Sequence, residues 1–163
     1  MSHFATVKEA KVTDVDAFIK ACAEYGMTEV KRSGATIKAW ARGDREDKVD
    51  VFCGYPESGS LCGRPKSQFG IGLKKNGDHY DMVADWSLTG FGLPSEIKAK
   101  LPHVKQFPGT DVNGEARQAC DEFRGLAMRD TSRHAIVSKF SKQGFMVDVK
   151  EEQDQTLRIR MTR

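Results

Sequence analysis

The sequence predicts an α+β protein with one mainly antiparallel sheet and two main helices on one face of it. Two segments, 15–22 and 115–142, place their apolar residues at helical spacing on one side only. Short alternating segments lie between and after them, as is typical of strands. Each helix has a single apolar stripe to bury, so both stripes are expected to pack on a shared layer of strands.

Length and composition fit a single domain over residues 1–163. The chain has 163 residues, of which 39% are hydrophobic and 30% charged, and a chain of this size buries about two thirds of its unfolded surface without disulfides or metals. It contains no run of the ~18 apolar residues that a membrane helix needs. The amino terminus lacks the basic and apolar regions of a secretory signal, so we expect a cytoplasmic protein.

The first strand is expected at Phe4–Val12. Thr13 is expected to cap a helix, with Asp16 three residues later as its partner. The apolar face of this helix consists of Val15, Phe18, Ile19 and Cys22. Gly26 ends the helix because glycine adopts a positive φ without strain.

Three strands follow, at 27–31, 35–41 and 49–53, and Ser33-Gly34 is expected to form a turn between the first two. The segments 54–68 and 87–114 are predicted to be long loops, because glycine, proline and serine are frequent in the first and three prolines interrupt the second. A short helix is expected within the second loop, at 95–100.

Asn76-Gly77 predicts a hairpin between strands at 69–73 and 80–84, because both residues tolerate the positive φ of a type I′ turn. Gly70 and Gly72 carry no side chains, which would leave one sheet face open to close approach. On the return strand, Asp81 and Asp85 share one face, and we expect water to solvate both.

The helix at 115–142 ends at Gly144, and two strands at 145–149 and 156–161 follow around an acidic turn. This order of helix, glycine, strand, turn and strand also occurs at 15–40. The repetition suggests a helix-hairpin pseudo-repeat in which both halves join the central hairpin in one antiparallel sheet.

Three segments in order along the chain resemble one family. They are Ser2-His3-Phe4, the stretch from Phe69-Gly70-Ile71-Gly72 through Asn76-Gly77 to Ala84-Asp85-Trp86, and His134 with Lys142-Gln143-Gly144-Phe145. They are similar to the hypothetical chloroplast open reading frame family number thirty-five, a conserved domain of unknown function with plastid, cyanobacterial, bacterial and phage members. Relative to that family, 54–68 and 90–113 look inserted, and Arg133 replaces an aromatic residue. The resemblance implies a fold and no activity.

Motifs for catalysis or metal binding are missing from the sequence. It has no nucleophile elbow, no phosphate loop and no helical histidine pair with a carboxylate. The four cysteines form no CxxC pair, although Cys53 and Cys62 flank the first loop. We therefore expect neither a metal nor a cofactor, and a binding protein rather than an enzyme.

The leading hypothesis is a non-catalytic protein that holds a protein partner or a small anionic ligand such as a nucleotide. Two tryptophans at strand ends could wall a shallow pocket in which arginine contacts an anion. The candidate ligand-binding residues are Trp40, Arg42, Asp85, Trp86, His134 and His3.

The alternative hypothesis is nucleic-acid binding, although a net charge of +3 is too small to argue for it alone. Its candidate residues are Arg64, Lys66, Lys74, Lys75, Arg158 and Arg160. A third hypothesis is an enzyme whose site combines His3, His134 and Asp85. Free strand edges would also allow a homo-oligomer.

Overall fold

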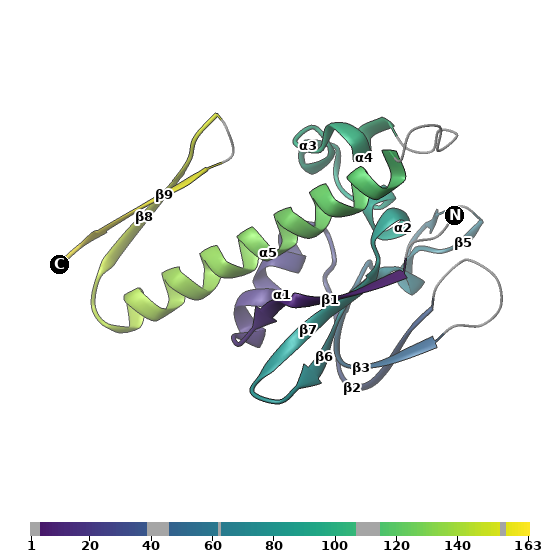
Figure 1. The fold of residues 1–163 in the computed structure, drawn as a ribbon, viewed down its shortest axis with the longest axis horizontal. Helices are drawn as coiled ribbons and strands as arrows, with labels where there is room; N and C mark the ends of the chain where they lie inside the picture. The colour runs from purple at the N-terminus through teal and green to yellow at the C-terminus, as the bar shows by residue number, and fades with distance from the viewer. Residues whose placement is uncertain (1–3, 39–45, 62, 107–114, 154–155) are drawn as a thin grey trace.

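The computed structural model describes residues 4–38, 46–61, 63–106, 115–153 and 156–163. The fold is α+β, as predicted: a five-stranded antiparallel sheet of order β1-β7-β6-β3-β2, on which two main helices, α1 and α5, pack together (Figure 1). The strands of this sheet are β1 (Phe4–Val12), β2 (Glu29–Lys38), β3 (Glu46–Gly54), β6 (Gly70–Asn76) and β7 (His79–Asp85), and the helices are α1 (Val15–Glu24) and α5 (Glu115–Lys142).

The main core lies between the sheet and these helices. Phe18 and Cys22 of α1 and Phe123 of α5 are almost fully buried there. The central strands contribute Val51, Cys53, Ile71, Leu73, Met82 and Ala84 to the same core. The apolar stripe of α1 and the first part of that of α5 therefore face a common layer of strands, whereas the predicted stripe of α5 beyond Thr131 is not buried.

The cap of the first helix lies one residue later than predicted. The Oδ1 atom of Asp14 accepts a hydrogen bond of 2.9 Å from the Ala17 amide, so Asp14 is the N-cap and the choice of Thr13 was wrong. Gly26, with a φ of +79°, follows the helix end as predicted.

The predicted turn at Ser33-Gly34 is a β-bulge inside one continuous strand. Both residues have positive φ, 74° and 68°, which is also the signature of a tight turn. The chain nevertheless continues along the same neighbour: Arg32 pairs with Val51 and Ala35 with Val49, and the register shifts between them. The single strand β2 thus replaces the two expected strands.

The central hairpin is confirmed, but its turn differs. Asn76 pairs with His79, so the turn residues are Gly77 and Asp78 rather than Asn76 and Gly77. The sheet face beside Gly72 is not open either. A Cβ atom there would lie 2.6 Å from Ile37 Cδ1 and 2.7 Å from Val49 Cγ1, because side chains of β2 and β3 fill the space.

Short elements occupy both predicted long loops. The first contains the hairpin β4 (Ser60–Leu61) with β5 (Arg64–Pro65) and the 3-10 helix η1 (Lys66–Gln68). The second contains the helices α2 (Trp86–Phe91), α3 (Ser95–Lys98) and α4 (Pro102–Gln106). The short helix expected at 95–100 is thus present as α3.

The last two strands, β8 (Met146–Glu151) and β9 (Leu157–Thr162), form a separate two-stranded sheet. The prediction that they join the main sheet was therefore wrong. The pseudo-repeat survives at the helix ends. The Met27 amide donates to the Cys22 carbonyl at 3.0 Å, and the Phe145 amide donates to the Phe140 carbonyl at 3.1 Å, around Gly26 and Gly144 respectively.

Candidate functional site

The most distinctive surface is the C-terminal arm, residues 132–163, which comprises the last part of α5 and the β8–β9 hairpin. Figure 1 shows it leaving the body of the molecule. None of the described residues in the arm is buried, whereas α5 contributes buried residues up to Thr131. Yet the arm carries many apolar residues: Ala135, Ile136, Val137, Phe140, Phe145, Met146, Val147, Val149, Leu157, Ile159 and Met161.

Three large hydrophobic side chains of the arm are exposed to an unusual degree. Ile136 is 37% exposed, Met161 44% and Met146 75%, and only Val30 joins them among the large exposed hydrophobic residues of the described chain. Met161 lies opposite Val147, whereas Met146 lies opposite Thr162 on the other face of the hairpin, so apolar side chains are exposed on both faces. Exposed apolar surface often marks an interaction site.

The hairpin has an apolar face and a polar face. Val147 pairs with Met161 and Val149 with Ile159, so these four side chains share one face. On the other face, Asp148 lies opposite Arg160 and Lys150 opposite Arg158. Because α5 packs against β8, β9 forms the outer strand of this ribbon.

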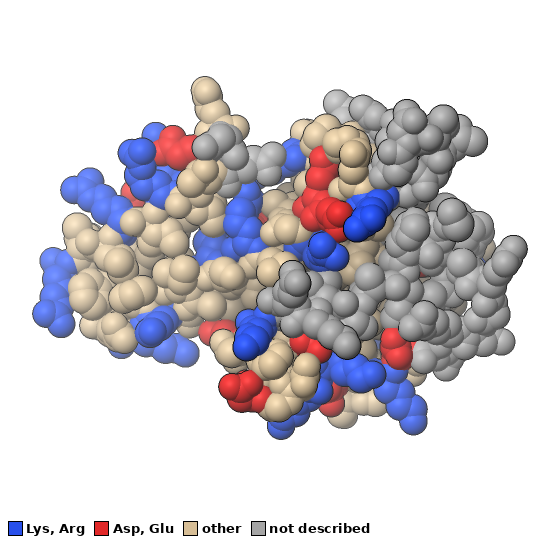
Figure 2. Space-filling model, in the orientation of Figure 1, with Lys and Arg blue, Asp and Glu red and all other residues tan. Residues whose placement is uncertain are grey.

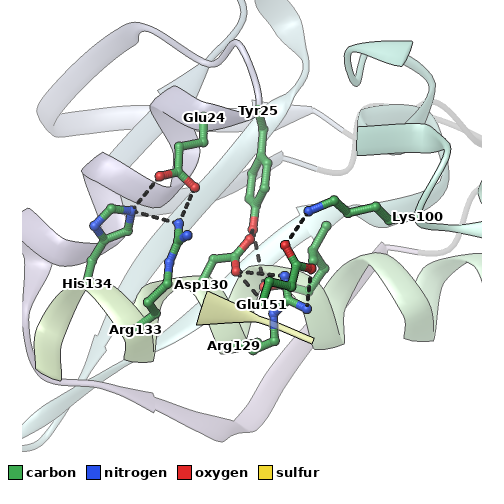
Figure 3. Close-up of polar contacts among 9 residues, drawn as sticks. Glu24, Tyr25, Lys100, Arg129, Asp130, Arg133, His134 and Glu151 are labelled. Atoms are coloured by element: carbon green, nitrogen blue, oxygen red, sulfur yellow. Dashed lines mark hydrogen bonds and ion pairs between the residues drawn. The ribbon is translucent and has the colours of Figure 1, made fainter. Parts of the chain in front are cut away.

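An ionic contact holds the turn end of the hairpin to the body. Glu151, the last residue of β8, accepts a hydrogen bond of 2.6 Å from Lys100 Nζ and lies 3.3 Å from Arg129 Nη1 (Figure 3). The hydrogen bond from Lys100, aided by the charges of Lys100 and Arg129, lowers the pKa of Glu151. The arm is thus attached through polar contacts where a buried core is lacking.

A buried contact fixes α5 just before the arm begins. The Tyr25 hydroxyl donates a hydrogen bond of 2.7 Å to Asp130 Oδ2, and Arg129 Nη2 lies 3.0 Å from Asp130 Oδ1 (Figure 3). Burial, followed by the charge of Asp130, raises the pKa of Tyr25 above its usual range. The phenol therefore remains a donor at any physiological pH.

His134, a predicted ligand contact, lies on this part of α5. Its Nε2 atom is 2.9 Å from Glu24 Oε1, and Arg133 also pairs with Glu24 (Figure 3). The side chain of His134 is 21% exposed. Its partner is a carboxylate of α1, so the contact ties the base of the arm to the first helix.

The other predicted ligand-binding residues do not form a pocket with His134. His3, Trp40 and Arg42 lie outside the described residues. Asp85 and Trp86 are consecutive at the junction of β7 and α2, and each is only 1% exposed. The expectation that Asp81 and Asp85 are solvated was therefore wrong, since Asp81 is also buried.

Trp86 is part of the aromatic core. Its ring meets that of Phe123 edge-on at a centroid distance of 5.5 Å, and Tyr25 meets the same ring at 5.8 Å. His134 lies eleven residues further along α5 than Phe123, a distance of roughly 16 Å at 1.5 Å per residue. Asp85 directly precedes Trp86, and Trp86 contacts Phe123. An enzyme site shared by Asp85 and His134 would therefore have to span about three turns of α5.

The predicted nucleic-acid residues are distributed over four elements, β5, η1, β6 and β9. Lys74 and Lys75 are exposed on β6, whereas Arg158 and Arg160 are exposed on β9 in the separate hairpin. Arg64 is exposed on β5, and Lys66 lies over the Tyr55 ring at 4.5 Å. They do not share one sheet or one face.

The excess of positive over negative charge is nevertheless concentrated on the arm. Residues 132–163 contain seven Lys and Arg against four Asp and Glu, whereas residues 1–131 contain nineteen of each kind. The whole net charge of +3 therefore belongs to the arm. Figure 2 shows the basic side chains spread over it among uncharged atoms.

Other local features offer less chemistry. A hollow of about 310 Å³ lies on the outer sheet face, beside Lys31, Phe52, Ser67 and Gln68. Among the described residues, no group of three or more His, Cys, Asp or Glu could hold a metal ion. Cys53 lies beside Cys22, and both are buried; Cys62 is outside the described residues.

The residues that anchor the arm were not singled out from the sequence. These residues are Glu24, Tyr25, Lys100, Arg129 and Asp130. One signal was available: Arg129, Asp130 and Arg133 follow an apolar stripe on α5 and interrupt it with charges. The partners of these charges are distant in the chain, so the sequence alone does not identify them.

Comparison of the chain with protein-family models, with curated proteins and with solved structures finds no match. The resemblance to the plastid reading-frame family stays a prediction. No helix in the described part of the chain is both long and apolar enough to cross a membrane.

Proposed function

We propose that this is a binding protein that holds a protein partner through its C-terminal arm. The observation that supports the proposal is the uncovered apolar surface of the arm, in which no described residue is buried. An isolated two-stranded hairpin is at best marginally stable in water. A partner that covers the apolar residues would add the burial that the arm lacks.

A small anionic ligand has less support. The hollow on the outer sheet face has Lys31 as the one charged residue in its described lining. The residues expected to form an anion site either lie outside the described chain or are distributed between the β7–α2 junction and α5. A protein partner is therefore the better supported of the two occupants.

Nucleic acid also has less support as the occupant of the arm. On the polar face, Arg158 lies 3.3 Å from Glu152, and Asp148 is directly opposite Arg160. A phosphate backbone that approached these arginines would also meet the carboxylates. The exposed methionines, moreover, offer nothing to phosphates and suit the apolar side chains of a protein.

Site-specific photo-crosslinking in the host tests the proposal. The crosslinking amino acid p-benzoylphenylalanine would replace Met146 or Met161 on the arm. It would also replace Val30 on β2, which is 38% exposed against 44% for Met161, as a control outside the arm. We expect the two arm positions to crosslink one discrete protein and Val30 not to. That protein, once purified, should bind the unmodified chain and lose affinity when Met146 and Met161 are both changed to Ser.

The proposal would be contradicted if neither arm position crosslinked a protein, or if all three positions crosslinked the same set. It would also fail if the purified candidate bound the doubly substituted chain as tightly as the natural one. Circular dichroism spectra of the two chains control for folding, and none of these exposed side chains is part of the core.

A further inference from the structure

We propose that the partner presents an extended acidic segment, in which acidic and apolar residues alternate, and that this segment pairs with the outer edge of β9. This inference rests on the proposed function, because it assigns a chemistry to the partner that the arm would hold.

The geometry leaves one edge of β9 available. In the described part of the chain, β9 pairs with β8 alone, and α5 packs against β8. In an antiparallel pair, the amide and carbonyl groups of alternate residues point away from the partner strand. Such an edge is a template for an added strand, whose main-chain hydrogen bonds supply affinity and whose side chains supply specificity.

The side chains of β9 define what the added strand should carry. Arg158 and Arg160 project from one face, while Leu157, Ile159 and Met161 project from the other. Directly opposite residues on neighbouring strands share a face, and opposite charges stabilise such pairs. Acidic residues would therefore lie opposite the two arginines, and apolar residues would extend the apolar face.

The electrostatics agree with this pattern. The arm holds the whole excess of three positive charges, because basic and acidic residues are equal in number in the rest of the chain. The side chain of Arg158 remains 75% exposed despite its contact with Glu152. A guanidinium group has five donors. Arg158 can therefore bind an acidic residue of a partner while it still contacts Glu152.

A second copy of this chain fits the edge less well. Symmetric antiparallel pairing of two β9 strands about a twofold axis normal to the sheet places residues of the same face opposite each other. Arg158 and Arg160 would then face arginines of the other copy, and directly opposed like charges are destabilising. An acidic segment avoids this repulsion.

The test is a binding titration of the full chain with a fluorescent peptide in which Glu alternates with Val. We expect saturable binding that weakens as salt is added. Reversal of both charges, by Arg158→Glu with Arg160→Glu, should weaken binding about tenfold or more. A peptide with Lys in place of Glu should bind the reversed chain better than the natural chain.

A matched control is Lys74→Glu with Lys75→Glu, which makes the same charge change on exposed β6 residues of the main sheet. This control should bind the acidic peptide as the natural chain does. Methylation of alternate backbone amides of the peptide should abolish binding, because a β-strand addition needs those donors. Circular dichroism would establish that both variants fold.

The inference would be overturned if the acidic peptide did not bind, or if the reversal on β9 and the control reversal on β6 weakened its binding equally. It would also be overturned if a peptide whose Glu and Val residues stand in separate blocks bound as tightly as the alternating peptide. Tighter binding of a single-stranded oligonucleotide, or sedimentation as a dimer that the arm reversal dissociates, would also overturn it. If crosslinking from Met146 and Met161 succeeds while the peptide fails, the proposed function stands and only this mode of recognition falls.

Discussion

Tyr25 and Asp130 form a buried hydrogen bond, 2.7 Å from the phenol oxygen to Oδ2, between the end of α1 and the middle of α5. They are separated by 105 positions in the chain. Asp130 lies two residues before the arm begins, so this contact marks the boundary between the packed part of α5 and the part without a buried core.

Removal of this donor should destabilise the protein. Tyr25→Phe keeps the ring contact with Phe123 but leaves the buried Asp130 carboxylate with one donor fewer. We expect the free energy of unfolding to fall by about 1–3 kcal/mol, measured by urea denaturation. Arg32→Ala, which breaks an exposed pair with Asp16, should cost less than about 1 kcal/mol. Equal effects of the two substitutions would contradict this role for Tyr25.

Two glycine substitutions should have opposite effects. Gly72→Ala places a Cβ atom 2.6 Å from Ile37 Cδ1 and 2.7 Å from Val49 Cγ1, and such overpacking costs about 1–3 kcal/mol. Gly125 is exposed on α5 with no atom within 4 Å of its added Cβ, so Gly125→Ala should stabilise by about 0.5–1 kcal/mol. Thermal unfolding of both variants would check this, and a neutral Gly72→Ala would show that β2 does not cover the sheet there.

Attachment of the hairpin should weaken in acid. The pKa of Glu151 is lower in the folded arm, chiefly because Lys100 donates to it. The contact therefore contributes fully above the usual glutamate pKa of about 4.3 and is lost as the pH falls through the lower folded value. Amide chemical shifts of Met146–Glu151 should follow this titration. Glu151→Gln should abolish it, and an unchanged titration in that variant would assign the effect to another group.

The buried thiols should be unreactive in the folded protein. Burial, together with the neighbouring Cys53, raises the pKa of Cys22 well above its usual range, and the thiolate is the reactive form. In a Cys62→Ser background, we expect iodoacetamide to modify Cys22, Cys53 and Cys120 only after denaturation, as measured by mass spectrometry. Rapid modification of Cys22 without denaturation would contradict the packing of α1 on β3.

Local patterns were sufficient to predict the main helices and the central hairpin. The expected helix at 115–142 has the bounds of α5, and the strand expected at Phe4–Val12 has those of β1. Both depend on periodicity within one segment. Likewise, the glycines at 26 and 144 end their helices with the same hydrogen-bond pattern, which only requires a residue free to adopt positive φ.

Contacts between distant segments were not predictable in the same way. Ser33 and Gly34 have the conformation of a turn, and only pairing with β3 on both sides makes them a bulge. The alternation in β8 and β9 identifies strands but does not say which sheet they join. The sequence makes His134 a candidate ligand contact, and its partner in the structure, Glu24, lies 110 residues away in the chain.

The most direct measurement is hydrogen exchange of the chain, alone and bound to the protein that crosslinks from Met146 and Met161. Alone, the amides of the arm should exchange much faster than those of the main sheet, because the arm lacks a buried core. In the complex, we expect protection over 146–162 and little change in β2 and β3. Protection confined to the main sheet, with the arm unchanged, would contradict the central claim that the arm holds the partner.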